Sequence, residues 1–193
     1  TSNAAIRNVG LTDGSVIGQR CVGGLVGYGE YSYIINSYAT GSVTGTWYDV
    51  GGLVGSIQYS TIIESYFTGS VTDGQYHVGG IVGYGEYSDI INCYATGSVT
   101  GTWYDVGGLV GWLGYSTINN CYATADVAGN SYVGGLVGLV FGDADSNEYS
   151  VSNCYATGSV AGVNYVGGLV GYRNGDGTIT SSYWDTDTSG QTV

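Results

Sequence analysis

The sequence predicts an all-β fold, a parallel β-helix (β-solenoid) in which each repeat of about 28 residues makes one turn. The first observation is an internal repeat: VGGLVGYGEYSYIINSYATGSVTGTWYDVGGLVG, residues 22–55, returns almost unchanged at residues 78–111. The second is the composition, with 37 glycines, 20 tyrosines and no proline among 193 residues. The third is that apolar residues form short runs between Gly, Asn, Asp and Ser rather than falling at helical spacing. Stacked short strands account for all three observations.

The repeats cover essentially the whole chain, so we treat residues 1–193 as a single repeat domain. The block V-G-G-(L or I)-V-G occurs six times, at spacings of 28, 28, 28, 27 and 33 residues, and a partial turn precedes it at residues 6–21. The six blocks begin at Val22, Val50, Val78, Val106, Val133 and Val166. One repeat cannot bury its own apolar face, whereas stacked repeats can. We therefore expect six to seven turns, with the right-handed coil that parallel crossovers favour.

Each repeat contains three short β-type runs, which in chain order are VGGLVG, I-I-N-x-Y-A and G-S-V-T. Stacking turns each position into a column, and the apolar columns that begin at Leu25, Ile34 and Val43 are expected in the core. The Gly23-Gly24 pair and its copies indicate a tight corner or a close approach of backbone. The alternative fold, a propeller or sandwich of antiparallel hairpins, needs longer repeats of about 40 residues.

Two further columns leave an alternative open. A tyrosine recurs in every turn; strict alternation from the Ile34 column places it inside, whereas a corner at Asn36 places it outside. The members of this Tyr38 column are Tyr38, Tyr66, Tyr94, Tyr122, Tyr155 and Tyr183. In the other column Cys93, Cys121 and Cys154 share one position on successive turns. Neighbours on adjacent turns lie within disulfide range, so one bridge along the stack is possible. A small, half-buried position that accepts Ser or a free Cys is the favoured alternative there.

The charge of the chain excludes some partners. The formal net charge is −12, from 15 acidic and three basic residues, and the three arginines are scattered. Proteins that bind phosphate backbones need clustered Lys or Arg, so nucleic acid and an anionic membrane surface are excluded as partners. No apolar run is long enough to cross a bilayer, so we expect no membrane insertion.

A candidate ligand-binding surface comes from the residues just before three successive VGG blocks. We call this set the aromatic strip; its members are Trp47, Tyr48, Asp49, Tyr76, His77, Trp103, Tyr104 and Asp105. Exposed aromatic rings beside hydrogen-bonding groups suit sugar rings or a protein partner. The alternative is repeat copying, with the rings folded over loop backbone.

Acid–base chemistry, or a metal held by Asp49, His77 and Asp105, is the sharper hypothesis for the centre of the strip. Both aspartates have the same T-W-Y-D-V-G-G context, which predicts equal pKa values rather than the divergent ones that a catalytic pair needs. We therefore favour a copied surface charge with an interleaved histidine, and we expect no catalytic residues.

One insertion, at residues 141–150, carries a candidate cation site. Its oxygen-bearing side chains are Asp143, Asp145, Asn147 and Glu148, and such oxygens suit Ca²⁺. The glycine of a sharp turn and a closing bidentate glutamate are both missing, so a solvated loop is the favoured alternative. No other cofactor is expected.

The repeated VGGLVG and NCYATGSVTG blocks, with SYWDTDTSG at residues 182–190, resemble the GLUG-motif repeat across residues 8–190. The resemblance implies a segment of a secreted or surface-anchored microbial protein, of the kind found in adhesin-like exoproteins and bacterial IgA-cleaving proteases. In those proteases the repeats lie outside the catalytic domain, so the resemblance implies no catalytic residue in this chain.

We therefore expect a non-enzymatic extracellular module that acts in adhesion or as a structural spacer and display stalk. A glycan or a cell-surface protein is the expected partner for adhesion. The alternatives are a filament subunit that stacks head to tail through unpaired strand edges, and a polysaccharide-cleaving β-helix enzyme.

Overall fold

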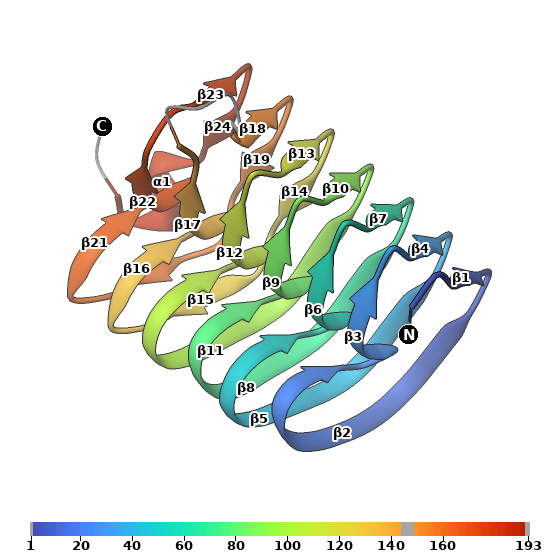
Figure 1. Ribbon diagram of the computed structural model, residues 1–193. Helices are drawn as coiled ribbons and strands as arrows, with labels where there is room; N and C mark the ends of the chain where they lie inside the picture. The colour runs from blue at the N-terminus through green and yellow to red at the C-terminus, as the bar shows by residue number, and fades with distance from the viewer. Residues whose placement is uncertain (1, 144–148, 192–193) are drawn as a thin grey trace.

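The computed structural model describes residues 2–143 and 149–191, and in it the chain winds into a parallel β-solenoid (Figure 1). Six turns, each with three faces, follow one another from the N-terminus, and a partial seventh turn ends the stack. Every strand pairing between the described residues is parallel, and the paired strands are about one repeat apart in the chain. The predicted fold class is confirmed.

The first face is a sheet of seven short strands built from the I-I runs. Its strands, in spatial order, are β1 (Ala5–Arg7), β4 (Tyr33–Ile35), β7 (Thr61–Ile63), β10 (Asp89–Ile91), β13 (Thr117–Asn119), β18 (Tyr149–Ser152) and β23 (Gly177–Thr180). Each strand places one large aliphatic side chain inside, and the register sets Ile62, Ile90 and Ile118 directly above one another. The predicted Ile34 column therefore lies in the core.

The second face is the longest and carries most of the aromatic residues. In the first four turns it consists of single long strands: β2 (Gly10–Gly23), β5 (Tyr38–Gly51), β8 (Tyr66–Gly79) and β11 (Tyr94–Gly107). In the last turns it is divided into β14 (Tyr122–Ala123), β15 (Asp126–Ala128), β16 (Ser131–Gly134), β19 (Tyr155–Ala156), β20 (Val160–Ala161), β21 (Asn164–Gly167) and β24 (Tyr183–Trp184). The G-S-V-T run was predicted as a separate short strand, but in the first turns it is the middle of a 14-residue strand.

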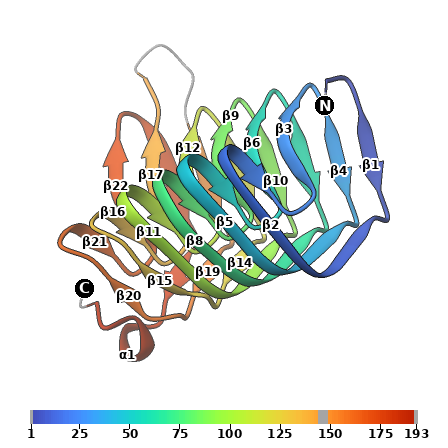
Figure 2. The ribbon, with the colours of Figure 1, turned by 90° about the horizontal axis from the view of Figure 1, so that it is seen from below.

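The third face closes the coil with six strands of five residues. They are β3 (Val26–Glu30), β6 (Val54–Gln58), β9 (Val82–Glu86), β12 (Val110–Gly114), β17 (Val137–Phe141) and β22 (Val170–Asn174). A short helix, α1 (Thr186–Ser189), lies outside the coil beside the last turn (Figure 2). Among the described residues no helix is long and apolar enough to cross a membrane.

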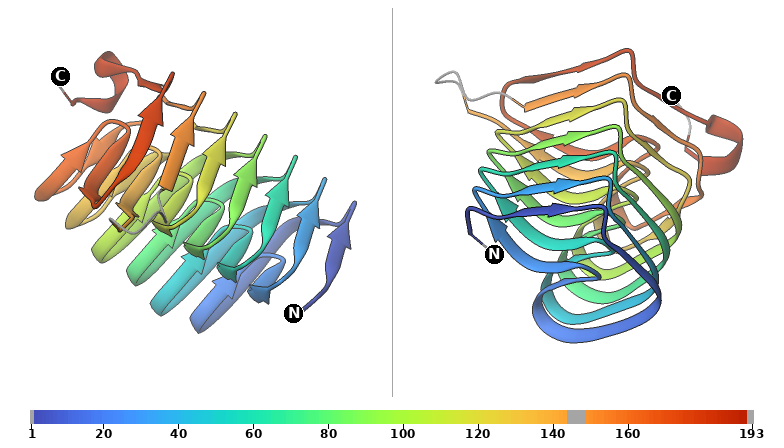
Figure 3. Two further views of the ribbon diagram at one scale, coloured as in Figure 1. Left: turned by 45° about the horizontal axis from the view of Figure 1, so that its top comes forward. Right: turned by 90° about the vertical axis from the view of Figure 1, so that its right-hand side faces the viewer.

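The corners between faces use residues in the left-handed backbone region rather than glycine alone. Asn36 and its equivalents have φ near 50°, as do Tyr31 and its equivalents at the preceding corner. In the second to fifth turns, the residue that follows each of these corners is a buried serine or cysteine whose side chain donates to the carbonyl two residues earlier, as Ser37 does to Ile35 at 2.9 Å. The I-I-N-x-Y-A run, which was predicted as one strand, is therefore broken at Asn36, and the turns keep one outline along the stack (Figure 3).

The repeated glycine pairs mark a corner where two turns touch through their backbones. A Cβ atom at Gly79 would meet the Val82 carbonyl oxygen within its own turn and lie 2.7 Å from the Gly111 nitrogen of the next turn. The predicted close approach of backbone is confirmed, because no larger side chain fits there. The VGGLVG run is consequently split, with its two halves in the second and third faces.

The structure decides both alternatives that the sequence left open, and the corner at Asn36 decides the first of them. The Tyr38 column lies on the outside, where its rings stack from turn to turn, as Tyr66 and Tyr94 do at 4.8 Å. Cys93, Cys121 and Cys154 are free thiols, and all three are buried rather than half-buried.

Candidate functional site

The residues just before the VGG blocks form a column at a third corner of the coil. They all have positive φ, from 48° at Cys21 to 61° at Asp49 and Asp105. The strands on either side are in parallel register, with Tyr48 opposite Tyr76 and Val50 opposite Val78. Because the corner repeats with each turn, the different side chains at this position are stacked directly on one another.

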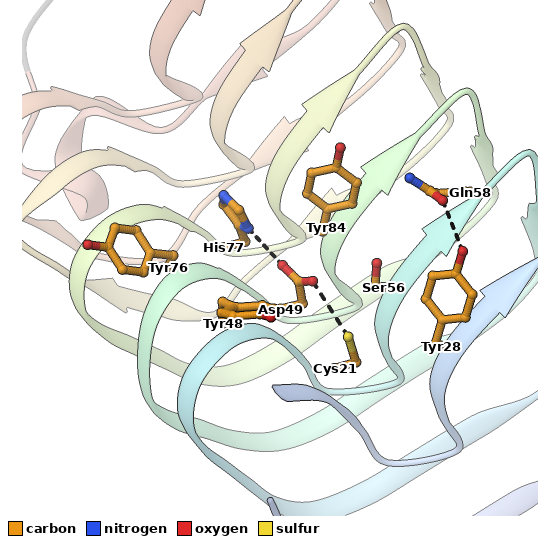
Figure 4. Close-up of a pocket in the computed structure, with 9 residues that line it drawn as sticks. All are labelled: Cys21, Tyr28, Tyr48, Asp49, Ser56, Gln58, Tyr76, His77 and Tyr84. Carbon is orange, nitrogen blue, oxygen red and sulfur yellow. Dashed lines mark hydrogen bonds and ion pairs between the residues drawn. The ribbon is translucent and has the colours of Figure 1, made fainter. Parts of the chain in front are cut away.

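In the column, His77 lies between two carboxylates. Its Nδ1 is 2.7 Å from Asp49 Oδ1 and its Nε2 is 3.3 Å from Asp105 Oδ2 (Figure 4 shows the contact with Asp49). The aspartate side chains are only 12% and 9% exposed and the histidine side chain is 26% exposed. The expectation of a copied surface charge was wrong, because both aspartates are buried, each with a carboxylate oxygen facing a ring nitrogen of His77.

The two aspartates have different surroundings despite their identical sequence context. Asp49 accepts from His77 on one oxygen and lies 3.7 Å from the Cys21 thiol on the other. Asp105 Oδ1 is buried without a hydrogen-bond partner among the described residues. Burial raises the pKa of Asp105 to about 6, and the nearby His77 opposes that rise. Identical local sequence therefore did not give identical environments, because the neighbouring turns supply different partners.

Cys21 is held as a protonated thiol. Burial raises its pKa to about 11, and the Asp49 carboxylate that accepts its hydrogen bond acts in the same direction. A thiolate is needed for nucleophilic attack or metal binding, so the position of Cys21 beside Asp49 disfavours both.

The remaining members of the aromatic strip lie together, as predicted. Trp47 and Trp103 are 47% and 48% exposed on turns on either side of Tyr76. The Tyr76 ring meets the Trp103 ring edge-on at 5.6 Å and stacks with Tyr104 at 5.8 Å. The alternative of rings folded over backbone does not describe the two tryptophans, which remain about half exposed.

Arg20 extends the strip toward the first turn. Its guanidinium lies over the ring of Trp47 at 4.3 Å and over that of Tyr48 at 5.0 Å. Such contacts are worth about 0.5–1 kcal/mol at exposed sites. The Arg20 guanidinium is therefore in contact with two aromatic rings.

A cavity of about 480 Å³ beside the strip was missed by the sequence analysis. It is lined by strip members from the second face and by Cys21, Tyr28, Ser56, Gln58 and Tyr84 (Figure 4). The signal was present in the third face, where VGYGE, VGSIQ and VGYGE follow one another on successive turns. These residues follow the VGG blocks and differ from turn to turn, so they form no motif of their own.

The candidate cation site falls largely outside the described residues. Asp145, Asn147 and Glu148 belong to the undescribed segment, while Asp143 is described and forms a hydrogen bond with Tyr115. Within residues 2–143 and 149–191, no three metal-ligating side chains gather into a group that could hold an ion. Calcium binding at the insertion stays a prediction.

Comparison with solved structures finds a similar fold in a putative immunoglobulin A1 protease from Bacteroides ovatus. The TM-score is 0.56 and the sequence identity is 22%, over 93% of this chain and 57% of that one. The chain thus spans little more than half of that protein's length, and the likeness shows the fold. A comparison with curated proteins finds no match.

The sequence matches a family model in five successive segments. The model is that of the GLUG motif, and the matched residues are 18–44, 48–72, 74–100, 104–128 and 129–161. Each matched segment corresponds to about one turn of the solenoid. The segments together cover more than half of the chain, and the chain therefore belongs to the GLUG-motif family.

Proposed function

We propose that this chain is a non-enzymatic binding module of a secreted or cell-surface protein, and that the aromatic strip attaches it to a glycan or to a protein on another surface. The observation that carries the proposal is the pair of tryptophans Trp47 and Trp103, each about half exposed and flanked by Tyr48, Tyr76 and Tyr104. Exposed Trp and Tyr are the residues that anchor partners most often. A rigid β-scaffold holds them at little cost in conformational entropy on binding.

The chemistry of the Asp49–His77–Asp105 triad supports binding rather than catalysis. A general base needs a ring nitrogen within reach of a reacting hydroxyl or water. Both nitrogens of His77 face carboxylates instead, at 2.7 and 3.3 Å. A glycosidase needs its scissile bond between two carboxyl groups, and here the space between Asp49 and Asp105 is filled by the imidazole.

The test is attachment of the purified chain to a glycan array and to intact cells. We expect the double variant Trp47→Ala plus Trp103→Ala to bind at least tenfold more weakly, because both anchors are removed. The matched control is Tyr31→Ala plus Tyr59→Ala, which removes rings that are 50% and 47% exposed at another corner. This control is expected to bind like the parent chain.

Other outcomes would identify the other roles. A chain that binds neither glycans nor cells would support a spacer, and growth of rods in electron micrographs would support head-to-tail assembly. Turnover of a polysaccharide that is lost in Asp105→Asn would contradict the proposal and favour an enzyme.

A further inference from the structure

The third face carries an outward column of large side chains that is interrupted at one turn. The parallel register stacks these positions from turn to turn; they are Tyr28, Ser56, Tyr84, Trp112, Leu139 and Tyr172. Where rings are adjacent they stack, as Tyr84 and Trp112 do at 4.5 Å with an angle of 3° between their planes. Ser56 is the one small residue of the column and leaves the turn between Tyr28 and Tyr84 without a ring.

The missing ring opens the cavity of about 480 Å³ described above. Tyr28 and Tyr84 lie two strand spacings apart, about 10 Å. That separation admits one ring between them at the spacing that the column itself shows for Tyr84 and Trp112. Tyr48 and Tyr76, which belong to the second face, line another side of this space (Figure 4). We call this space the Ser56 slot, bounded by Tyr28, Ser56, Tyr84, Tyr48 and Tyr76.

Polar groups line the inner edge of the Ser56 slot. Ser56 is only 4% exposed, and it lines the cavity between Tyr28 and Tyr84 (Figure 4). The Asp49 carboxylate lies beside it and has acceptor capacity beyond the contacts with His77 and Cys21. A hydroxyl can donate one hydrogen bond and accept others, and a carboxylate can accept several, so an occupant with hydroxyl groups of its own can bond to both.

A hydrogen-bonded chain holds the outer rim of the slot in place. The Tyr28 hydroxyl donates to Gln58 Oε1 at 2.9 Å, and Gln58 Nε2 donates to Glu86 Oε2 at 2.8 Å. Glu86 also accepts from the Tyr84 hydroxyl; burial foremost, and then this carboxylate, raise the pKa of Tyr84. The two ring walls are therefore connected through Gln58 and Glu86, and the slot is preformed.

The charge of the slot restricts the occupant. Neither Lys nor Arg lines it, and Asp49 contributes a carboxylate. The nearby cation, Arg20, lies over the rings of Trp47 and Tyr48. His77 also lines the cavity, but its two ring nitrogens face Asp49 and Asp105. An anionic ligand would therefore approach the Asp49 carboxylate without a free cationic side chain to compensate, which costs free energy.

We propose that the Ser56 slot binds a single uncharged pyranose ring of a glycan. The C–H faces of the sugar would pack on Tyr28 and Tyr84, and its edge hydroxyls would bond to Ser56 and Asp49. An aromatic side chain would fill the same space but would make no hydrogen bond to the Ser56 hydroxyl. The proposal rests on the proposed function and deepens it, since it names the ligand class and places the sugar beside the tryptophans.

The deciding variant is Ser56→Tyr, which supplies the missing ring from the chain itself. Its matched control is Leu139→Tyr, which adds the same ring in the same column away from the slot. Tyr84→Ala, which removes one wall, is a second variant in case the added ring disturbs folding. Circular dichroism and urea unfolding show whether each variant is folded.

Binding is measured by saturation-transfer NMR and titration with methyl glycosides of glucose, galactose, mannose and N-acetylglucosamine. Glucuronic acid, sialic acid and p-cresol serve as anionic and aromatic probes. We expect at least one neutral glycoside to bind the parent chain and Leu139→Tyr equally. Its Kd should rise at least tenfold in Ser56→Tyr and in Tyr84→Ala.

Three results would overturn the proposal. Neutral glycoside binding that survives Ser56→Tyr and disappears in the Trp47→Ala plus Trp103→Ala variant would place the sugar on the strip, and the proposed function would stand. Attachment to cells through the tryptophans, with no neutral glycoside bound, would remove the sugar and keep the adhesive role. Tighter binding of an acidic sugar or of p-cresol would assign the slot to another ligand class.

Discussion

Two columns of outward side chains run along the solenoid, and they differ in how strictly the turns repeat them. In the Tyr38 column the first turn has Gly10 and every later turn supplies a tyrosine; successive rings from Tyr38 to Tyr155 stack at 4.8–4.9 Å with planes within 4°. In the column of the third face that begins at Tyr28, here called the Tyr28 column, the residue type changes from turn to turn. Its serine at position 56 opens a cavity beside two rings. Strict repetition in the Tyr38 column gives a continuous surface of stacked rings. The substitution of a ring by Ser56 in the Tyr28 column gives a concave surface.

The corner column that contains His77 shows the same relation between substitution and chemistry. All its members share the left-handed backbone, so each residue is presented in the same way. On one turn this position is His77, whereas the turns before and after it have Asp49 and Asp105. This single difference brings a histidine into contact with two carboxyl groups. A solenoid can therefore acquire a site by changing one residue on one turn, because stacking brings the neighbours into contact without any change of backbone.

The largest expected effect concerns the two aspartates, which the repeat made identical in sequence. The pKa of Asp105 is about 6 in the folded chain and its ordinary value is 3.8, so the native state binds the proton more tightly than the unfolded state. The protonated Asp105 carboxyl stabilises the folded state fully below pH 4, and this stabilisation is lost as the pH rises through 6. The free energy of unfolding changes by about 3 kcal/mol between these limits. We expect Asp105→Asn to unfold at higher urea than the parent chain at pH 7, with the difference disappearing near pH 4.

The matched control is Asp49→Asn, in the same local sequence. Asp49 holds His77 at 2.7 Å and also accepts from Cys21, so its loss is expected to destabilise the chain at pH 7 by about 1–3 kcal/mol. Urea midpoints for both variants at pH 4, 5, 6 and 7 measure the difference. Equal curves for the two variants would show that the environments of the aspartates do not differ in solution.

A smaller effect on stability is expected from removing one ring of the Tyr38 column. Tyr94→Ala removes a ring that stacks on Tyr66 at 4.8 Å and on Tyr122 at 4.9 Å. Two such contacts predict a loss of about 1–2 kcal/mol in the free energy of unfolding. Tyr183→Ala, in the same column but 69% exposed in the last turn, is expected to cost less than about 0.5 kcal/mol. Similar losses for the two variants would mean that stacking along the column adds nothing to stability.

The sequence was sufficient to predict the fold, because a repeat constrains the stacking of every column at once. The apolar columns and the parallel turns followed from the period alone. The strand limits did not, because they depend on which residues adopt positive φ: Asn36 resembles many loop asparagines, but Tyr31 in the same role is unusual for a bulky side chain.

The candidate site was only partly predictable, for a related reason. The stacking of His77 between two aspartates followed from the repeat spacing. Their burial did not, because it depends on Tyr84 and Trp112 of the third face, whose rings lie 5.4 and 6.3 Å from the His77 ring. The Ser56 slot was missed because a missing side chain has no motif, and it is evident only after the columns are aligned across three turns.

The smallest expected effect tests a substitution that should create no site. In the column that contains Ser37 and Ser65, later turns carry cysteine. Cys121 Sγ donates to the Asn119 carbonyl at 3.2 Å and accepts from the Cys93 N–H at 3.3 Å. Ser65 makes the same two contacts, to Ile63 and from Ser37, at 2.8 and 3.1 Å.

Because the hydrogen bonds are interchangeable, Cys121→Ser is expected to change the free energy of unfolding by no more than about 0.5 kcal/mol. Cys121→Ala, which leaves the Cys93 N–H without its acceptor, is expected to cost roughly 1 kcal/mol or more. Urea unfolding under reducing conditions compares the two variants. A large cost for serine together with a small cost for alanine would show that the sulfur is retained for its packing. The cysteines would then be a feature of the later turns that the earlier ones do not share.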